Sequence, residues 1–564
     1  MTDAIVFPSA GASVAEVLGF ADLVLTGGKV VTVDAVFSVV QAVAIRDGKF
    51  LAAGSVAEIE KLCGPRTRRI DLAGRTVLPG LIDTHIHVER AGLAAVTVSF
   101  EGAKTVDDAL ERVAAQAALL PPGSWIRGAN WHPMSQLREK RMMTRYELDR
   151  VAPDHPVCLP IGHFTMTNSL GLRLAGITAQ TPDPDGGIIH RDAETGEPNG
   201  ILEEAAEDLV RDLLPEWSHE ERVAQLRQAM AFCNRHGLTS AISAAVDPAT
   251  FRAHQHLRDH RQATLRISAM YAPTGGLNPA MTIEEWETFF SRIGASSDFG
   301  DEWLSYSGVK LQIDGGMTLR TAAMRDGYPD DPNYGGTIVI EPERFHALVA
   351  TANRYGWRVG VHAVGDAAVD LVLDAYENAD RERSIRGRRF IVIHGSLIQR
   401  DQMERAKALD VRVDAQSAFL WDKAAIVAQY LGKATADRAF PMRSLIDVMG
   451  LDLLGQGTDY PINSINPFIN ISVMVTRQDR NGDVYGASEA ITREEAIRAY
   501  TSAAARYAFR EDSLGSIEPG KLADLVILTD DILSVPDEKL KSIGVVATIV
   551  AGKPVFGEDA LSHL

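Results

Sequence analysis

The sequence predicts an α/β protein built on a (β/α)8 barrel, with a small β-domain contributed by both ends of the chain. Three observations support this fold class. Eight apolar, strand-like runs alternate with helical stretches between about residues 78 and 505, β-rich segments flank that region on both sides, and polar side chains gather where the strand-like runs end. Alternating strands and helices are typical of a parallel sheet covered by helices, and eight such units close into a barrel.

The flanking segments read as short strands separated by turns. ADLVLTGGKVVTVD and QAVAIRDGKFLAAG near the beginning, and KLADLVILTDD and GVVATIVAGKPVFG near the end, combine β-branched runs with glycine-containing turns. Such strands need partners that cover their apolar faces. We therefore expect residues 1–77 and 506–564 to build one β-domain together.

The central region supplies the eight candidate barrel strands. In chain order they are TVLPGLIDTHIHV, GLTSAISAA, TLRISAMYA, GVKLQID, WRVGVHAVG, RFIVIHGS, VRVDAQSA and LDLLGQGTD. Helical stretches such as PERFHALVATANRYG lie between them. The alternative is an open, doubly wound sheet, which would carry a glycine-rich phosphate loop after its first strand, and the sequence has none there.

The predicted barrel, residues 78–505, is longer than the roughly 250 residues typical of this fold. Most of the excess falls between the first and second strands, at about residues 97–220, where SWIRGANWHP and PIGHFTMTNSLGL occur. Long insertions of this kind are usually functional. We expect this one to lie over the mouth of the barrel as a lid or substrate-recognition element.

Composition limits the partners of the protein. The chain of 564 residues has a formal net charge of −18, whereas nucleic-acid binding requires clustered Lys and Arg. Its three cysteines are scattered, which suits a reducing compartment, and it has no secretory-signal pattern and no apolar run of about 18 residues. We expect a cytoplasmic protein that acts on a small molecule, without nucleic-acid or membrane partners; a homodimer is a general expectation only.

Polar side chains end five of the eight predicted strands, and in this fold the carboxyl ends of the strands carry function. These residues are His85 and His87 on the first strand, Lys310 on the fourth, His362 on the fifth, His394 on the sixth and Asp459 on the eighth. A single histidine in an apolar strand is more often a hydrogen-bonded core residue. Four imidazoles converging with a carboxylate favour a metal site instead.

Two further features leave alternatives open. Lys310 within an apolar strand is costly to bury, so we expect either an ion pair with a neighbour such as Asp314 or a covalent modification. The stretch AHQHLRDH contains His254, His256 and His260, but it reads as a charged helix away from the strand ends. We interpret those three histidines as solvent-exposed helix surface.

The motifs GLIDTHIHV, GVKLQIDGG, VHAVGDAA, VIHGS, GTDYP and SLGSIEPGKLADLVIL resemble the amidohydrolase superfamily. The matching branch is amidohydrolase family 3, or the YtcJ-like group, and the resemblance runs from about Ala21 to Gly557. It implies a barrel with a composite β-sandwich from both termini. It also implies hydrolysis of C–N bonds in amides, formamides, carbamates or cyclic ureas.

The resemblance assigns roles to the residues at the strand ends. It implies that His85, His87, His362, His394 and Asp459 are metal ligands, and that Lys310 matches a lysine that is carboxylated and bridges two metals in many members. The sequence departs from the family pattern at GANWHP, where His132 stands at a position that is commonly acidic. This departure affects the choice of substrate rather than the metal.

The expected chemistry is hydrolysis by water bound to one or two divalent ions, Zn²⁺ first and another divalent metal as the alternative. Asp459 is the expected general acid and base. His163 is expected either to stabilise the oxyanion or to be a structural histidine of the insertion. Expected pocket residues are Trp131, His132, Arg320 and Tyr460. A metal-dependent lyase, decarboxylase or isomerase on the same barrel is the alternative function, and a non-enzymatic binding protein is the other.

Overall fold

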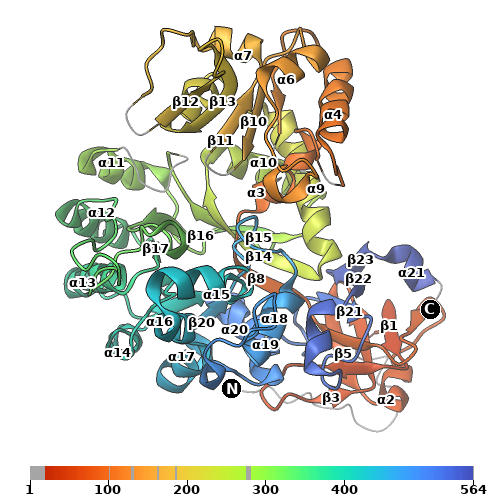
Figure 1. Ribbon diagram of the computed structural model, residues 1–564. Helices are drawn as coiled ribbons and strands as arrows, with labels where there is room; N and C mark the ends of the chain where they lie inside the picture. The colour runs from red at the N-terminus through yellow and green to blue at the C-terminus, as the bar shows by residue number, and fades with distance from the viewer. Residues whose placement is uncertain are drawn as a thin grey trace. The chain divides into compact units, whose positions relative to one another are not determined.

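The computed structural model describes residues 19–100, 102–128, 133–161, 164–184, 187–274 and 281–562 (Figure 1). The chain divides into two compact units. One unit comprises Glu89–Ala229, and the other comprises the segments Met1–Val88 and Met230–Leu564 on either side of it.

The larger unit contains an eight-stranded parallel sheet whose strands follow one another in chain order. They are β8 (Leu81–Ile86), β14 (Leu238–Val246), β15 (Arg266–Tyr271), β16 (Leu304–Gln312), β17 (Val359–Ala363), β18 (Ile391–His394), β19 (Arg412–Ala415) and β20 (Leu454–Gln456). Each predicted run supplies one of these strands. Just beyond β20, the Asp459 amide donates a hydrogen bond to the His85 carbonyl oxygen (2.7 Å), which links the last strand to the first. The prediction of a (β/α)8 barrel is confirmed.

Helices separate successive barrel strands. They include α10 (Pro248–Asp259), α11 (Ile283–Ile293), α12 (Pro342–Arg354), α13 (Asp366–Glu382), α14 (Arg400–Ala408), α15 (Ala418–Leu431), α16 (Lys433–Arg438) and α17 (Met442–Met449), and α18 (Pro467–Thr476) follows the last strand. Helix α13 shows why they pack on the sheet: Val369, Val372, Leu373 and Tyr376 recur at helical spacing and are buried. The Tyr376 hydroxyl also donates to backbone carbonyls of β17 and β18.

Strands from both ends of the chain form two further sheets, in the orders β5-β4-β1-β6 and β23-β22-β21-β7-β2-β3. Their bounds are β1 (Leu23–Thr26), β2 (Lys29–Val31), β3 (Val39–Val40), β4 (Ala42–Arg46), β5 (Lys49–Gly54), β6 (Arg68–Asp71), β7 (Thr76–Pro79), β21 (Leu525–Leu528), β22 (Val545–Val550) and β23 (Lys553–Phe556). One apolar core joins residues from both sheets, among them Leu25, Ile45, Ile527 and Ile549. The predicted composite β-sandwich is confirmed.

The run TVLPGLIDTHIHV is two strands rather than one. Strand β7 pairs with β21 in the sandwich, and β8 pairs with β14 in the barrel. Gly80 lies between them, and a Cβ at this position would lie 2.1 Å from Oγ1 of Thr239. Glycine therefore allows the chain to pass from one sheet to the other against β14. His85 lies on β8, and His87 follows the end of that strand.

The Glu89–Ala229 unit has its own sheet, in the order β12-β13-β11-β10-β9. The strands are β9 (Ile126–Arg127), β10 (Val157–Ile161), β11 (Phe164–Thr167), β12 (Gly187–Arg191) and β13 (Pro198–Glu204); helices of this unit include α4 (Val106–Leu119), α6 (Arg145–Val151) and α7 (Ser169–Leu174). An apolar cluster that includes Leu110, Leu148 and Leu159 fills its interior. The expected boundaries of the insertion, its place over the barrel mouth and the domain limits at 77/78 and 505/506 stay predictions.

One expectation about the helices is wrong. His254 on α10 is buried, because it follows the apolar face formed by Phe251, Ala253 and Leu257. His256 and His260 lie toward the surface with their rings stacked at 4.1 Å. Among the described residues, these three histidines are not part of a group suited to a metal ion.

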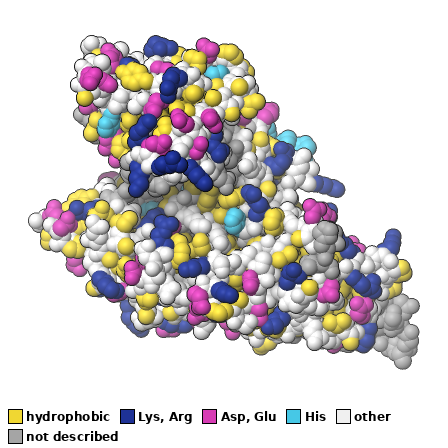
Figure 2. Space-filling view, turned by 45° about the vertical axis from the view of Figure 1, so that its right-hand side comes forward, with side chains coloured by type: hydrophobic (Ala, Val, Ile, Leu, Met, Phe, Trp, Pro, Cys, Tyr) yellow, Lys and Arg dark blue, Asp and Glu magenta, His cyan; other side chains and the backbone are white. Residues whose placement is uncertain are grey.

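The surface carries both signs of charge. On the face that Figure 2 shows, Lys and Arg side chains lie among Asp and Glu side chains and hydrophobic ones. Within the described ranges, no helix has the length and hydropathy needed to span a membrane.

Candidate metal centre

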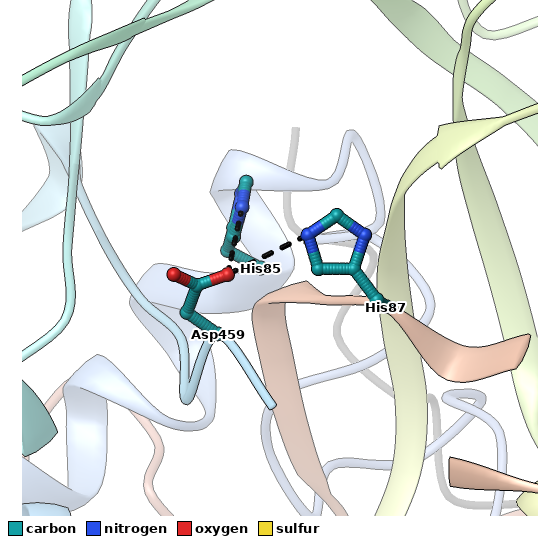
Figure 3. A group of neighbouring side chains, drawn as sticks. All are labelled: His85, His87 and Asp459. Carbon is teal, nitrogen blue, oxygen red and sulfur yellow. Dashed lines mark ion pairs between the residues drawn. The ribbon is translucent and has the colours of Figure 1, made fainter. Parts of the chain in front are cut away.

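His85, His87 and Asp459 face one another at the carboxyl end of the barrel strands (Figure 3). Nε2 of His85 and Nε2 of His87 lie 3.5 and 3.6 Å from the same oxygen, Oδ1 of Asp459. One ligand atom from each residue lies within 4.8 Å of the others. These separations exceed a normal hydrogen bond and suit three atoms that each bind one ion at about 2.0–2.2 Å.

The two remaining predicted histidines continue this group. The His394 ring lies 5.3 Å from the His85 ring and 4.4 Å from the His362 ring, measured between centroids. His362 lies on β17, and His394 ends β18 with a φ of 76°, a left-handed conformation that is uncommon for residues other than glycine. The barrel therefore brings all four predicted imidazoles to one place.

The protonation of these side chains suits a metal site. Burial lowers the pKa of His85 and of His394 well below the ordinary histidine value, and it lowers the pKa of His362 to about 3. The positive charge of Lys310 adds to the lowering at all three residues, and at His394 the neighbouring rings of His362 and His85 contribute more than Lys310 does. These three imidazoles are therefore neutral near pH 7. A neutral imidazole offers the lone pair that a metal ion requires.

Lys310 on β16 lies in the same interior, with 2% of its surface exposed. Burial lowers the pKa of its amine to about 8, and the Asp459 and Asp414 carboxylates oppose that shift. Among the described residues, no carboxylate forms an ion pair with Lys310 within 4.0 Å. The alternative of an ion pair with Asp314 is therefore wrong.

Asp314 has a different part in the structure. Its carboxylate accepts hydrogen bonds from the backbone amides of Ala323, Val364 and Gly365, at 2.9–3.0 Å, and Oδ1 lies 3.7 Å from Nε2 of His362. It therefore ties the loop after β16 to the end of β17. This arrangement holds the backbone beside His362.

Two residues at the end of the seventh strand, Asp414 on β19 and Gln416 just after it, lie against the histidines, and sequence reasoning missed them. Oε1 of Gln416 lies 2.6 Å from Nδ1 of His394, so the amide oxygen accepts a hydrogen bond from Nδ1–H, and Nε2 is the nitrogen that can bind a metal ion. Oδ2 of Asp414 lies 3.5 Å from Nδ1 of His85, while Thr84 donates to Oδ1 (2.6 Å). The sequence signal for them is the run VRVDAQ. It places Asp414 and Gln416 two positions apart at a strand end, which is the spacing of His85 and His87 in THIH.

The expected pocket residues are placed only in part. The Tyr460 ring follows Asp459 and lies 5.6 Å from the Phe232 ring. Arg320 forms an ion pair with Asp330 at 2.7 Å, in the loop after β16. Trp131, His132 and His163 lie outside the described residues. The pocket roles of these residues stay predictions.

The chain is similar in sequence to known proteins. A model of the amidohydrolase family matches residues 68–556. The putative amidohydrolase YtcJ of Bacillus subtilis (strain 168) is 30% identical over 531 residues, covering 92% of this chain and 96% of that protein. The N-substituted formamide deformylase of Arthrobacter pascens is 30% identical over 548 residues, covering 94% and 97%.

A solved structure agrees with these sequence matches. The crystal structure of an uncharacterized metal-dependent hydrolase from Pyrococcus horikoshii OT3 superimposes with a TM-score of 0.73 at 26% identity. The match covers 92% of this chain and 99% of that one.

Proposed function

The chain belongs to the amidohydrolase family and is a metal-dependent hydrolase, and we propose that it cleaves a carbon–nitrogen bond of a small molecule. The bond is of the amide, formamide, carbamate or cyclic urea type. The observation that carries this proposal is the convergence of two imidazole nitrogens on one oxygen of Asp459, at 3.5 and 3.6 Å. The formamide deformylase among the relatives supports a formamide as the first substrate class to test.

We assign His85, His87 and Asp459 as ligands of a divalent ion, with Lys310, His362 and His394 completing one or two ion positions. The donor set of neutral imidazoles and carboxylate oxygens fits Zn²⁺, and other divalent metals share part of this preference. Carboxylation of Lys310 would replace an unpaired buried amine with an anionic ligand. When bound, such an ion lowers the pKa of water from 15.7 toward about 7 and polarises a carbonyl group.

The chain itself supplies the proton transfers and the positioning. Asp459 accepts a proton from the attacking water and returns it to the leaving nitrogen. Its backbone is held by the hydrogen bond to the His85 carbonyl, so the carboxylate keeps its place beside the imidazoles. We propose His163 as the donor to the developing oxyanion, and Trp131, His132, Arg320 and Tyr460 as pocket residues.

The test of this assignment is Asp459→Asn, assayed on a panel of N-substituted formamides with metal content measured by mass spectrometry. We expect turnover to fall about 10²- to 10⁴-fold while most of the metal is retained, because an amide is a poor base. Asp47→Asn, at an exposed position in the sandwich, is the matched control. Near wild-type turnover by the Asp459 variant would show that another group transfers the proton.

Product analysis separates hydrolysis from the alternatives on the same barrel. Hydrolysis in H₂¹⁸O places ¹⁸O in the acid product, whereas a lyase, decarboxylase or isomerase leaves the product unlabelled. An unlabelled product would reject the proposed reaction without changing the family or the ligand assignment.

A further inference from the structure

Lys423 lies beside the metal centre, although no motif in the sequence draws attention to it. It belongs to α15, which follows β19, and its Nζ lies 4.2 Å from the centroid of the Phe419 ring. The Phe419 ring in turn lies 5.8 Å from the His394 imidazole. On its other side, Nζ donates to the Ile462 carbonyl oxygen (3.4 Å) and to Oδ1 of Asn463 (3.3 Å).

These contacts place the amine between two walls of the site. Phe419 connects it to the end of β18, where His394 lies. Ile462 and Asn463 belong to the loop that begins with Asp459, and the Ile462 amide donates to the Asp459 carbonyl oxygen. The Asn463 side chain donates to the Thr458 carbonyl oxygen at 3.0 Å. Lys423 thus borders the metal centre from the side of β19 and β20.

Lys423 has no ion-pair partner within the described part of the chain. No carboxylate there forms an ion pair with Nζ within 4.0 Å, and both acceptors are neutral and lie at long hydrogen-bond distances. The nearby Asp422 pairs with Arg480 instead. Burial lowers the pKa of Lys423 to about 8, while Asp459 and Asp422 oppose that shift, so most molecules carry the charge at pH 7.

A half-buried cation with only weak neutral acceptors gains most from a charged acceptor. The aromatic ring of Phe419 lies next to Nζ, and Ile462, whose carbonyl oxygen accepts from Nζ, is 49% exposed, so an apolar group can accompany that acceptor. Lys433, a lysine on the following helix α16, already has such an acceptor: it lies over the ring of Tyr485 and is ion-paired with Asp437 at 2.7 Å.

We propose that Lys423 binds a carboxylate of the substrate, so that the preferred substrates are N-acyl compounds carrying an acid group close to the scissile C–N bond, as in an N-formyl amino acid. This inference rests on the proposed function, because it names the substrate class of the same site. The competing explanation is that Lys423 only holds the loop after β20, and so positions Asp459 through Ile462 and Asn463. The two explanations differ in what a substitution does to substrates with and without the acid group.

The experiment uses two substrates that differ only in that group, N-formylphenylalanine and N-formyl-2-phenylethylamine. We expect the wild-type protein to favour the first by about tenfold or more in kcat/KM, which corresponds to the gain from one charge-assisted contact. Lys423→Met should reduce that preference about tenfold, mainly by raising KM for the acid, and Lys423→Arg should restore part of it. Lys433→Met is the matched control and should keep the wild-type preference.

Two results would overturn the proposal. One is a wild-type protein without preference for the acid. The other is a Lys423→Met protein that loses activity equally on both substrates, which would assign Lys423 to loop positioning. Circular dichroism and the melting temperature show whether the variants are folded, and Lys423→Gln serves if the Met variant is not.

A binding measurement separates this inference from the proposed function. Calorimetric titration of the full-length protein, before and after EDTA treatment, compares 3-phenylpropanoate with 3-phenylpropanamide. If neither formamide is hydrolysed, formamide cleavage is wrong, but binding still decides the role of Lys423. Tighter binding of the carboxylate by wild type than by Lys423→Met supports the proposal with or without metal. Equal binding by both proteins rejects it.

Discussion

The two ends of the barrel both bury charged side chains, but they satisfy them in different ways. At the amino end, Nε and Nη2 of Arg266 bind the two oxygens of Asp524 at 2.7 and 3.0 Å. The same carboxylate accepts the Ala551 amide (2.8 Å), and the guanidinium lies over the Trp303 ring. At the carboxyl end, Nε2 of His85 and Nε2 of His87 lie 3.5 and 3.6 Å from Oδ1 of Asp459.

This difference in pairing indicates different roles for the two clusters. The Arg266–Asp524 pair is complete within the protein and joins the start of β15 to the start of β21 in the sandwich. The group at the other end is also largely buried, but its ligand atoms are spaced to surround an ion. A buried ion pair whose hydrogen bonds close within the protein therefore indicates a structural role, and polar atoms spaced to surround an ion at the strand ends indicate a site.

Removing a ligand should have the largest effect. His85→Ala leaves one imidazole and one carboxylate of the central group, so we expect metal content to fall below about one tenth of the wild-type value and turnover to be lost with it. Metal analysis of the purified variant checks this. A His85→Ala protein with full metal content would exclude His85 as a ligand. The control is His256→Ala, at a position toward the surface of α10.

Breaking the complete pair should damage stability and leave the site intact. Asp524→Ala leaves the buried guanidinium of Arg266 without its carboxylate partner, which lowers the free energy of unfolding by about 3–5 kcal/mol. Metal content per folded molecule should stay at the wild-type level. Urea denaturation of Asp524→Ala and of the double variant Arg266→Met/Asp524→Leu measures the effect, and the double variant should recover most of the loss. Loss of metal in the single variant would contradict the separation of the two clusters.

A smaller effect is expected from the residue that orients His394. Gln416→Leu removes the acceptor of the Nδ1 proton while keeping a side chain of similar size. Metal affinity should fall about 10- to 100-fold, as it does for other residues that orient ligands. Competition with a metal-binding dye measures this, and Gln180→Leu, at an exposed position of the Glu89–Ala229 unit, is the control. Unchanged affinity would show that the ring orientation of His394 is set by packing alone.

The sequence predicted the fold and the convergence at the strand ends because both depend on regular spacing. Apolar runs of strand length recur eight times, and a polar residue at the end of such a run has to face the rim of the barrel. Lys310, His362 and His394 were found in this way.

Other features depend on tertiary contacts, which spacing does not reveal. Gln416 and Lys423 carry ordinary polar side chains, and only the neighbours that the fold supplies, His394 for one and Phe419 for the other, make them parts of the site. The prediction for His254 is wrong because the many charged residues of its helix indicate an exposed surface, whereas this residue falls on the apolar face. The division of the first run at Gly80 follows from the approach of Thr239, far along the chain.

The passage of the chain through Gly80 has a consequence for synthesis on the ribosome. Strand β7 leaves the ribosome early, yet its neighbour β21 begins at Leu525, after the whole barrel has been translated. The first sandwich strands therefore keep exposed edges until the C-terminal strands have been synthesised and can pair with them. Because β7 continues directly into β8, the late pairing of β7 also affects β8, the strand that carries His85. We expect nascent chains that stop before Leu525 to require chaperones, and the sandwich to be the step that completes folding.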